Sequence, residues 1–225
     1  MPPLSYIIKK ENKNHDTPWL NVINRCLMLP SYFYTKIIIF VPTTQVDYLA
    51  TWLGMYSLYT PPTTSYTWGC AILSRIPFAT SSFQILSSPG GENACFQHAT
   101  FRVWDGVVHI FNTHFGDLDS DVPLQAQHVS ELAKNVLQAK GEALIIGGDI
   151  NAAPLTTAYN ELLVSNMYDT QAQTQGPWNT TLDRDPGAGY IFASRSLKTT
   201  SWQEPHYSQY KTSDGYPIIA TFVRA

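Results

Sequence analysis

The chain has 225 residues, 44% of them hydrophobic and 14% charged, and its formal net charge is −3. These values exclude a disordered protein and predict a single domain, over residues 1–225, with a sizeable core. An acidic balance without a cluster of Lys or Arg disfavours a nucleic acid as the partner. No segment reaches the roughly 18 apolar residues of a membrane span, and the N-terminus lacks the pattern of a signal peptide. We expect a monomer, and association with membrane partners remains open.

The apolar and turn residues predict the elements in chain order. These are a strand at 4–8, a helix at 19–29 that stops at Pro30, a strand at 36–41, a helix at 43–55 capped by Thr43 or Thr44, strands at 67–78, 81–88, 94–104 and 106–115, a helix at 122–141, a strand at 143–148, a helix at 154–166 opened by Pro154, and strands at 189–194 and 216–225. Asp105-Gly106 predicts a hairpin, and Gly141 a helix C-cap. Strands outnumber helices, so we expect a two-sheet α+β or α/β sandwich with helices on its outer faces.

The three cysteines, Cys26, Cys70 and Cys95, are widely spaced and form no CxxC pattern. This spacing disfavours a zinc site and a disulfide framework. We expect buried free thiols, with one disulfide as the alternative for an oxidising compartment. The sequon at Asn179 matters only if the domain is secreted or lumenal.

Polar residues follow several predicted strands at the point where each strand ends. His114 and then Asp117 follow the strand at 106–113, Asp149 and Asn151 follow the strand at 143–148, and Asp214 precedes the last strand. Such a cluster of Asp, Asn and His side chains offers the hard oxygen ligands that suit Mg²⁺ or Mn²⁺. A metal held there would polarise a phosphoryl oxygen and stabilise a leaving oxyanion.

Each of these residues also has a purely structural interpretation. Asp149, Asn151 and Asp214 are typical of turns, and His114 alone would fit a core histidine. Asp117, Asp119 and Asp121 are expected to form a solvated acidic loop, because they lack the spacing of a calcium site. The remaining candidates are aromatic side chains that are expected in the core or its rim, with a lipid-facing role as the alternative: Tyr56, Tyr59, Tyr66, Trp68, Trp178 and Trp202.

Five segments, in order from residue 68 onward, resemble the endonuclease/exonuclease/phosphatase superfamily. They are WGCAILSRIPF, FNTHFGD, GGDINAAP, GYIFAS and SDGYPIIATF, which resemble the superfamily's GxAILSRxPI, NTH, GDFNxxP, DYIF and SDHYPV segments. The matches of LSYII and IIIFVPTTQ near the N-terminus, within the first 40 or so residues, are weaker. This resemblance implies a four-layered α/β sandwich of two mixed sheets flanked by helices, and metal-dependent phosphodiester chemistry.

A closer similarity is carried by YTPPTTSYTWGCAILSRIPF, LSSPGGENA and THFGDLDSD. These stretches resemble the C-terminal domain of the proteins that remodel GPI-anchor lipids, namely the fungal Cwh-type and the PGAP-two-interacting proteins. That resemblance implies a phosphodiester lipid or glycolipid as the partner and the endomembrane system, ER or Golgi, as the location. It also implies a domain whose catalytic motifs are commonly eroded.

Matched residue by residue, the resemblance assigns four site positions. It implies that Asp149 and Asn151 place the attacked phosphate and the nucleophile, and that His114 donates to or stabilises the phosphoryl group. Asp214 would assist the placement of a metal or a histidine. Asp149, Asn151 and Asp214 are then the candidate ligands of Mg²⁺ or Mn²⁺.

The other family positions differ. The general-base histidine aligns with Gly215 and the aspartate that orients it with Gly189, while the main metal-ligand glutamate aligns with Val41 and the opening asparagine with Ile7. Glu11 or Glu92 is an alternative metal ligand. Because loss of a general base alone costs roughly 10²–10⁴ in rate, the hypothesis is a weakened or inactive member.

Three functions therefore stay open at this stage. The first is a GPI-lipid-remodelling type of domain that acts on or binds a phosphodiester lipid with a degraded site. The second is an active Mg²⁺-dependent phosphodiesterase, similar to sphingomyelinases or nucleases. The third is a truncated or mispredicted gene product, which the weak N-terminal matches motivate.

Overall fold

The structure is a computed structural model that describes residues 20–24, 45–60, 69–88, 93–103, 106–139, 141–163, 166–175, 189–204 and 218–225. The predictions for strands at 4–8 and 36–41, and for the caps Thr43 and Thr44, lie outside these ranges. None of the helices in the described part is long and apolar enough to span a membrane.

A six-stranded mixed sheet organises the molecule, with the strand order β4-β5-β6-β7-β9-β8. Its strands are β4 (Thr80–Leu86), β5 (Ala94–Val103), β6 (Gly106–His114), β7 (Glu142–Asp149), β8 (Met167–Asp169) and β9 (Gly189–Ser194). Only β6 and β7 pair in parallel within this sheet. The pairing of Val103 with Gly106 confirms the predicted hairpin between β5 and β6.

Further strands cover one face of this sheet, which we call the inner face. They are β1 (Leu20–Asn24), β11 (Ile218–Arg224) and β10 (Leu197–Gln203), paired in that order, and the separate pair β2 (Tyr56–Thr60) and β3 (Cys70–Ser74). The β2–β3 pair packs on β5 and β6, and the β1–β11 pair lies against β9. All of these covering strands pair antiparallel.

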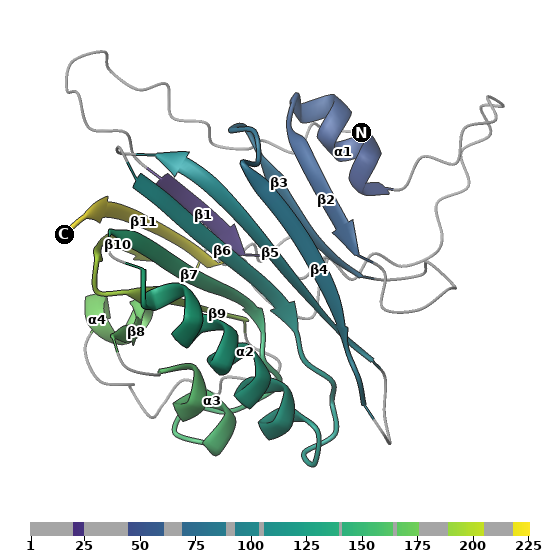
Figure 1. The fold of residues 1–225 in the computed structure, drawn as a ribbon, viewed down its shortest axis with the longest axis vertical. Coiled ribbons are helices and arrows are strands. Elements are labelled where there is room, and N and C mark those ends of the chain that lie inside the picture. Colours follow the sequence, from purple (N-terminus) through teal and green to yellow (C-terminus); the bar gives the residue numbers. More distant parts are fainter. Residues whose placement is uncertain are drawn as a thin grey trace, which may run out of the picture.

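Helices flank the sheets, as the α/β class requires. They are α1 (Gln45–Leu53), α2 (Val122–Leu137), α3 (Thr157–Leu162) and α4 (Thr170–Gln175). Figure 1 shows α2 and α3 side by side over the outer face of the large sheet, with α1 beside β2 at the opposite side of the molecule. The arrangement confirms the predicted α/β fold of sheets with flanking helices.

The alternation of side chains along the strands builds two apolar cores. Phe111, Leu144 and Ile146 point outward and pack with α2 and α3, whereas Val108 and Ile145 point inward and pack with β10 and β11. Because strand side chains alternate between faces, the inward set of β6 and β7 continues to the last residue of each strand. His114 and Asp149 therefore belong to the inner face.

The prediction of a helix at 19–29 is wrong over the residues that the structure describes there. Residues 20–24 form strand β1, which pairs antiparallel with β11, Leu20 opposite Phe222. The segment contains Val22 and Ile23, β-branched residues that favour strands. Pairing with the other end of the chain overrides the helical spacing of its apolar residues.

Two predicted helix ends also differ. The C-cap of α2 is Gln138 instead of Gly141, which has a φ of 87° in the turn before β7. Helix α3 begins only at Thr157, because Leu155 has a left-handed φ of 69° and the Thr156 hydroxyl caps the helix by accepting from Tyr159 N. Four short elements were not predicted: β2, β8, α4 and β10.

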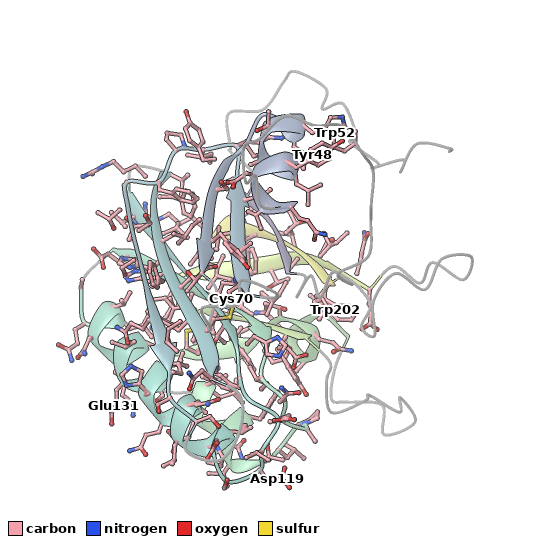
Figure 2. All side chains as sticks on the ribbon, turned by 90° about the vertical axis from the view of Figure 1, so that its right-hand side faces the viewer. Tyr48, Trp52, Cys70, Asp119, Glu131 and Trp202 are labelled. Atoms are coloured by element: carbon pink, nitrogen blue, oxygen red, sulfur yellow. A yellow bond between two sulfur atoms is a disulfide. The ribbon has the colours of Figure 1, made fainter. Side chains whose placement is uncertain are left out.

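The expectation of free thiols is wrong for two of the three cysteines. Cys70 on β3 and Cys95 on β5 form a disulfide across a sequence separation of 25 residues. Figure 2 shows Cys70 in the middle of the molecule, between the two layers of strands. The bond fixes the β2–β3 pair on the inner face of the large sheet. Cys26 lies outside the described residues.

Candidate functional site

Four residues form one row across the strand ends of the large sheet. Cys95 pairs with His114, His114 with Asp149 in the parallel β6–β7 ladder, and Asp149 with Gly189. Directly paired residues have side chains on the same face of a sheet. The imidazole of His114 and the carboxylate of Asp149 are thus neighbours on the inner face, at the end where both strands stop.

Gly148 allows β6 and β7 to approach each other at this end. Its φ is 150°, and a Cβ added there would lie 1.8 Å from the carbonyl oxygen of Thr113. No other residue fits that space, so the second glycine of the GGD segment is a steric requirement. The sequence shows it as a glycine directly before the acidic residue.

The chain turns sharply after Asp149. The Oδ1 atom of Asp149 accepts from the backbone N–H of Asn151 at 2.9 Å, and Asn151 has a left-handed φ of 44°. This is the turn that the structural interpretation of the two residues predicted. The same turn brings the Asn151 side chain back toward the end of β6, so the structural and the functional interpretation are compatible.

Two further hydrogen bonds join this turn to the residue after His114. The side-chain Nδ2 of Asn151 donates to the carbonyl of Phe115 at 2.7 Å, and the N–H of Phe115 donates to the carbonyl of Asp149 at 2.9 Å. The structure thus brings three of the four predicted site residues together, and we call His114, Asp149 and Asn151 the strand-end cluster. The fourth, Asp214, lies outside the described residues.

The acidic loop after the cluster differs in part from the prediction. Asp117 and Asp119 are exposed, as expected, and Figure 2 shows Asp119 at one end of the molecule. Asp121, however, is only 4% exposed, and its carboxylate contacts the hydroxyls of Ser88 and Ser120. It ties the end of β4 to the start of α2 and is not a solvated charge.

A buried polar network that was not predicted lies one row further into the sheet. Gln97 Nε2 donates to the carbonyl of Cys70 at 3.1 Å and to the hydroxyl of Thr60 at 3.0 Å. Asn112 Nδ2 donates to Gln97 Oε1 at 2.9 Å and to the carbonyl of Ala71 at 3.2 Å. The sequence contains one indication of this network, because Asn112 and His114 are two residues apart on one strand and therefore lie on the same face.

The described residues offer a divalent cation few ligands. No group of three or more His, Cys, Asp or Glu side chains suited to a metal occurs among them. Asp149 and Asn151 contribute oxygen atoms, and the Nδ2 contact to Phe115 leaves the Oδ1 atom of Asn151 as its only possible ligand atom. Mg²⁺ is commonly held by one or two carboxylates together with water and substrate phosphate, and this donor set fits that mode only.

The position beside Asp149 across β9 carries no side chain. It is Gly189, where the superfamily's orienting aspartate is expected by resemblance, and its backbone is not among those with a positive φ. No left-handed backbone conformation therefore requires a glycine at this position, and the carboxylate is missing only because the sequence has Gly189 there. The other family positions, at Ile7, Val41 and Gly215, and the alternative ligands Glu11 and Glu92 lie outside the described residues.

Three of the six aromatic candidates lie within the described residues, and three lie outside them. Tyr56 is 52% exposed, and Trp202 is half-buried against the inner core. Partial burial raises the pKa of Tyr59. Tyr66, Trp68 and Trp178 lie outside the described residues. Of the three that the structure describes, Tyr59 and Trp202 are half-buried, as the prediction of core and rim positions requires, whereas Tyr56 is mostly exposed.

Comparison with known proteins places this geometry in a family. A family model described as the PGAP2IP C-terminal nuclease-like domain matches residues 33–183. The protein cwh43 of Schizosaccharomyces pombe is 36% identical over 104 residues, which is 46% of this chain and 10% of that protein. The chain therefore spans only about a tenth of this curated relative.

Solved structures show the same fold at low sequence identity. The human Nocturnin catalytic domain, solved with a bound sulfate anion, superimposes with a TM-score of 0.64 at 19% identity, covering 80% of this chain and 76% of that one. A mannosyl-6-phosphatase of Bacteroides thetaiotaomicron gives a TM-score of 0.63 at 14% identity, covering 80% and 81%. These likenesses show the endonuclease/exonuclease/phosphatase fold.

Proposed function

This chain belongs to the family of PGAP2IP C-terminal nuclease-like domains, and we propose that it binds the phosphodiester of a lipid or glycolipid at the strand-end cluster, with its catalytic power weakened or lost. The extension of this proposal to a whole GPI-lipid-remodelling protein rests on cwh43, of which the chain covers a tenth.

One observation carries the proposal. His114 lies beside Asp149 in the parallel ladder, and Asn151 is bonded back to Phe115, so an imidazole, a carboxylate and an amide meet at one strand end. An imidazole can donate a hydrogen bond to a phosphoryl oxygen. The chemistry of this set suits a bound phosphate, and the fold is shared with a phosphatase and with a domain solved with sulfate.

We expect weakened catalysis because two groups of the superfamily's site are missing from this sequence. With Gly189 beside Asp149 and Gly215 in the SDG segment, neither the general base nor its orienting carboxylate is present at the matching positions. A phosphodiester can still be held by His114, but no group at those positions would activate water. Loss of such a base typically costs about 10²–10⁴ in rate.

We propose a supporting role for a divalent cation. Asp149 and Asn151 would hold Mg²⁺ or Mn²⁺ only in company with the phosphodiester, because the two side chains alone are too few ligands. When bound, the ion would neutralise part of the phosphate charge. The chain's own contribution is to keep Asp149 and Asn151 in one fixed turn, through the bond between Asn151 N and Asp149 Oδ1.

The Cys70–Cys95 bond supports a lumenal location. Structural disulfides persist in oxidising compartments and are rare in the cytosol. Together with the relation to cwh43 and the PGAP2IP family, this favours the lumen of the endomembrane system. The sequon at Asn179 agrees with that location.

Lipid binding is testable with vesicles. The domain is mixed, with Mg²⁺ present, with phosphatidylinositol-containing vesicles and with vesicles of a galactolipid that has no phosphodiester. We expect sedimentation with the first kind only, and about tenfold weaker binding for His114→Ala, because a hydrogen bond to a charged phosphate is lost. Asp117→Ala, in the exposed loop nearby, is the matched control. Equal binding to both kinds of vesicle, or no effect of His114→Ala, would contradict the proposal.

An active phosphodiesterase remains the second candidate. The observation in its favour is that His114, Asp149 and Asn151 are all retained at one strand end. It requires that residues other than Gly189 and Gly215 supply the base. Turnover assays with Mg²⁺ and Mn²⁺ separate the two functions, because only an active phosphodiesterase loses its turnover in Asp149→Ala.

A further inference from the structure

Gln125 contacts the strand end from the side opposite the cluster. It lies in the first turn of α2, the residue is 3% exposed, and its Oε1 accepts from the backbone N–H of Gly116 at 2.9 Å. Gly116 is two residues beyond His114. The segment from His114 to Gly116 is therefore held by Asp149 and Asn151 on one side and by Gln125 on the other.

The other polar atom of the Gln125 amide, Nε2, shows which of its two polar atoms the contact with Gly116 depends on. This nitrogen is buried and has no hydrogen-bond partner within the described part of the chain. A backbone N–H needs an acceptor, so Oε1 must face Gly116 and Nε2 must face away from it. A buried donor without a partner is unfavourable for stability, and a methionine of similar length would remove it but leave the buried Gly116 N–H without its acceptor. These two costs oppose each other, so what glutamine specifically supplies at this position is the acceptor for the Gly116 N–H.

The contact lies where the β6 ladder ends. His114 is the last residue of β6, Phe115 N–H makes one more ladder bond to Asp149, and Gly116 N–H donates to Gln125 within the described part of the chain. Strand ends open locally when their last hydrogen bonds are lost, and a glycine adds backbone freedom. Without Gln125, the end of β6 that presents His114 would open more readily, held only by the bonds to Asp149 and Asn151 among the contacts described above.

We infer that Gln125 is a positioning residue, whose amide oxygen holds the Gly116 N–H and so fixes the end of β6 and the direction of the His114 imidazole beside Asp149. The inference gives the proposed phosphodiester site a residue from the outer-face helix, and it rests on that proposed function for its purpose. The contact itself can be tested without any ligand.

Three variants separate positioning from packing. Gln125→Met keeps the length and removes the acceptor, Gln125→Glu keeps an acceptor at the same reach, and Ser130→Ala is the control. Ser130 is on the same helix, is fully buried, and has a hydroxyl without a partner among the described residues. Hydrogen exchange at the Gly116 amide and the NMR signals of the His114 imidazole are measured in each variant, with the thermal midpoint.

In Gln125→Met we expect exchange at Gly116 to accelerate about fivefold and the His114 signals to shift, with little change in the thermal midpoint. Gln125→Glu should restore the protection, and Ser130→Ala should leave both signals unchanged. If Gln125→Met does not fold, Gln125→Asn, which is one methylene too short to reach Gly116, takes its place. Unchanged Gly116 and His114 signals in the acceptor-free variant would overturn the inference.

The failure of the proposed function would look different. Glycerophosphoinositol, a soluble phosphodiester, is titrated into the parent protein with Mg²⁺ while the His114 signals are followed. Absence of any shift would contradict the phosphodiester site and leave the comparison of Gln125 variants intact. A shift that is weakened in Gln125→Met and restored in Gln125→Glu supports both.

Discussion

Gly148 on β7 lies against Thr113 on β6, and both its backbone conformation, with a φ of 150°, and its lack of a side chain are required there. The Cβ of an alanine would lie 1.8 Å from the Thr113 carbonyl oxygen, so the strands would have to separate. We expect Gly148→Ala to lower the free energy of unfolding by at least about 4 kcal/mol, measured by urea denaturation.

The matched control for that variant is Gly54→Ala. Gly54 also has a positive φ, of 62°, but nothing lies within 4 Å of the added Cβ. Its cost should be only the backbone strain, about 1–2 kcal/mol. Similar losses for the two variants would mean that the close approach of β6 and β7 is not what requires Gly148.

His98 lies on the outer face of the sheet, beside His109. Its Nε2 is 2.8 Å from His109 Nδ1, and His109 Nε2 lies 2.9 Å from a carboxylate oxygen of Glu142. Burial, and then the charge of His109, lower the pKa of His98 from 6.5 to about 4, against the opposing effect of Glu142. The folded protein therefore binds fewer protons at His98 than the unfolded chain does below pH 6.5.

The contribution of His98 to stability is complete above pH 6.5 and is lost as the pH falls toward 4. Urea denaturation at about pH 7.5 and about pH 5 should show a smaller loss on acidification for His98→Gln than for the parent. His128→Gln, on the solvent side of α2, is the control. An equal loss in the His98 variant and the parent would contradict the assignment.

At the scale of elements, the β2–β3 pair depends on the large sheet for its position. It is fixed there by the Cys70–Cys95 disulfide and by the amide of Gln97, which donates to Thr60 and to the carbonyl of Cys70. A cross-link over 25 residues reduces the conformational freedom of the unfolded chain. We expect the Cys70→Ser/Cys95→Ser double variant to unfold with about 3 kcal/mol less free energy.

Reduction provides the control for this prediction. A reducing agent should lower the urea midpoint of the parent toward that of the double variant and leave the double variant unchanged. Cys26→Ser should behave like the parent. If reduction leaves the midpoint of the parent unchanged, the bond does not contribute to stability, and the support it gives to a lumenal location is also lost.

The sequence predicts elements best where the pattern is local. The strands β3 to β7 and the helix α2 follow from β-branched runs, the Asp105-Gly106 turn and helical spacing. Residues 20–24 do not follow, because their strand conformation depends on β11 at the other end of the chain. Short elements such as β8 and α4 carry too few residues for a period to be recognised.

The same distinction applies to the strand-end cluster. His114, Asp149 and Asn151 could be predicted because each follows a recognisable strand, and strand ends converge in space. Asp121 and Gln125 could not be assigned their contacts, because their partners Ser88 and Gly116 are reached only through the packing of α2 on the sheet. Polar residues in a helix give no local sign of which loop they contact.

In the whole molecule, the endonuclease/exonuclease/phosphatase fold is retained and one strand end keeps His114, Asp149 and Asn151, while Gly189 pairs with Asp149. We therefore expect that substitution can restore the two missing groups, the general-base histidine and the aspartate that orients it. The backbone of Gly189 is not among those with a positive φ, so an aspartate is compatible with it. We expect Gly189→Asp/Gly215→His to gain about 10²-fold or more in phosphodiester hydrolysis over the parent.

The most direct test is hydrolysis with Mg²⁺ and Mn²⁺ of an aryl phosphodiester, sphingomyelin, phosphatidylinositol and DNA. The parent, Asp149→Ala and the Gly189→Asp/Gly215→His variant are compared side by side. The account predicts a parent close to the Asp149→Ala level and a clear gain in the double variant on a lipid phosphodiester. Robust turnover by the parent that Asp149→Ala abolishes would contradict it and establish an active phosphodiesterase.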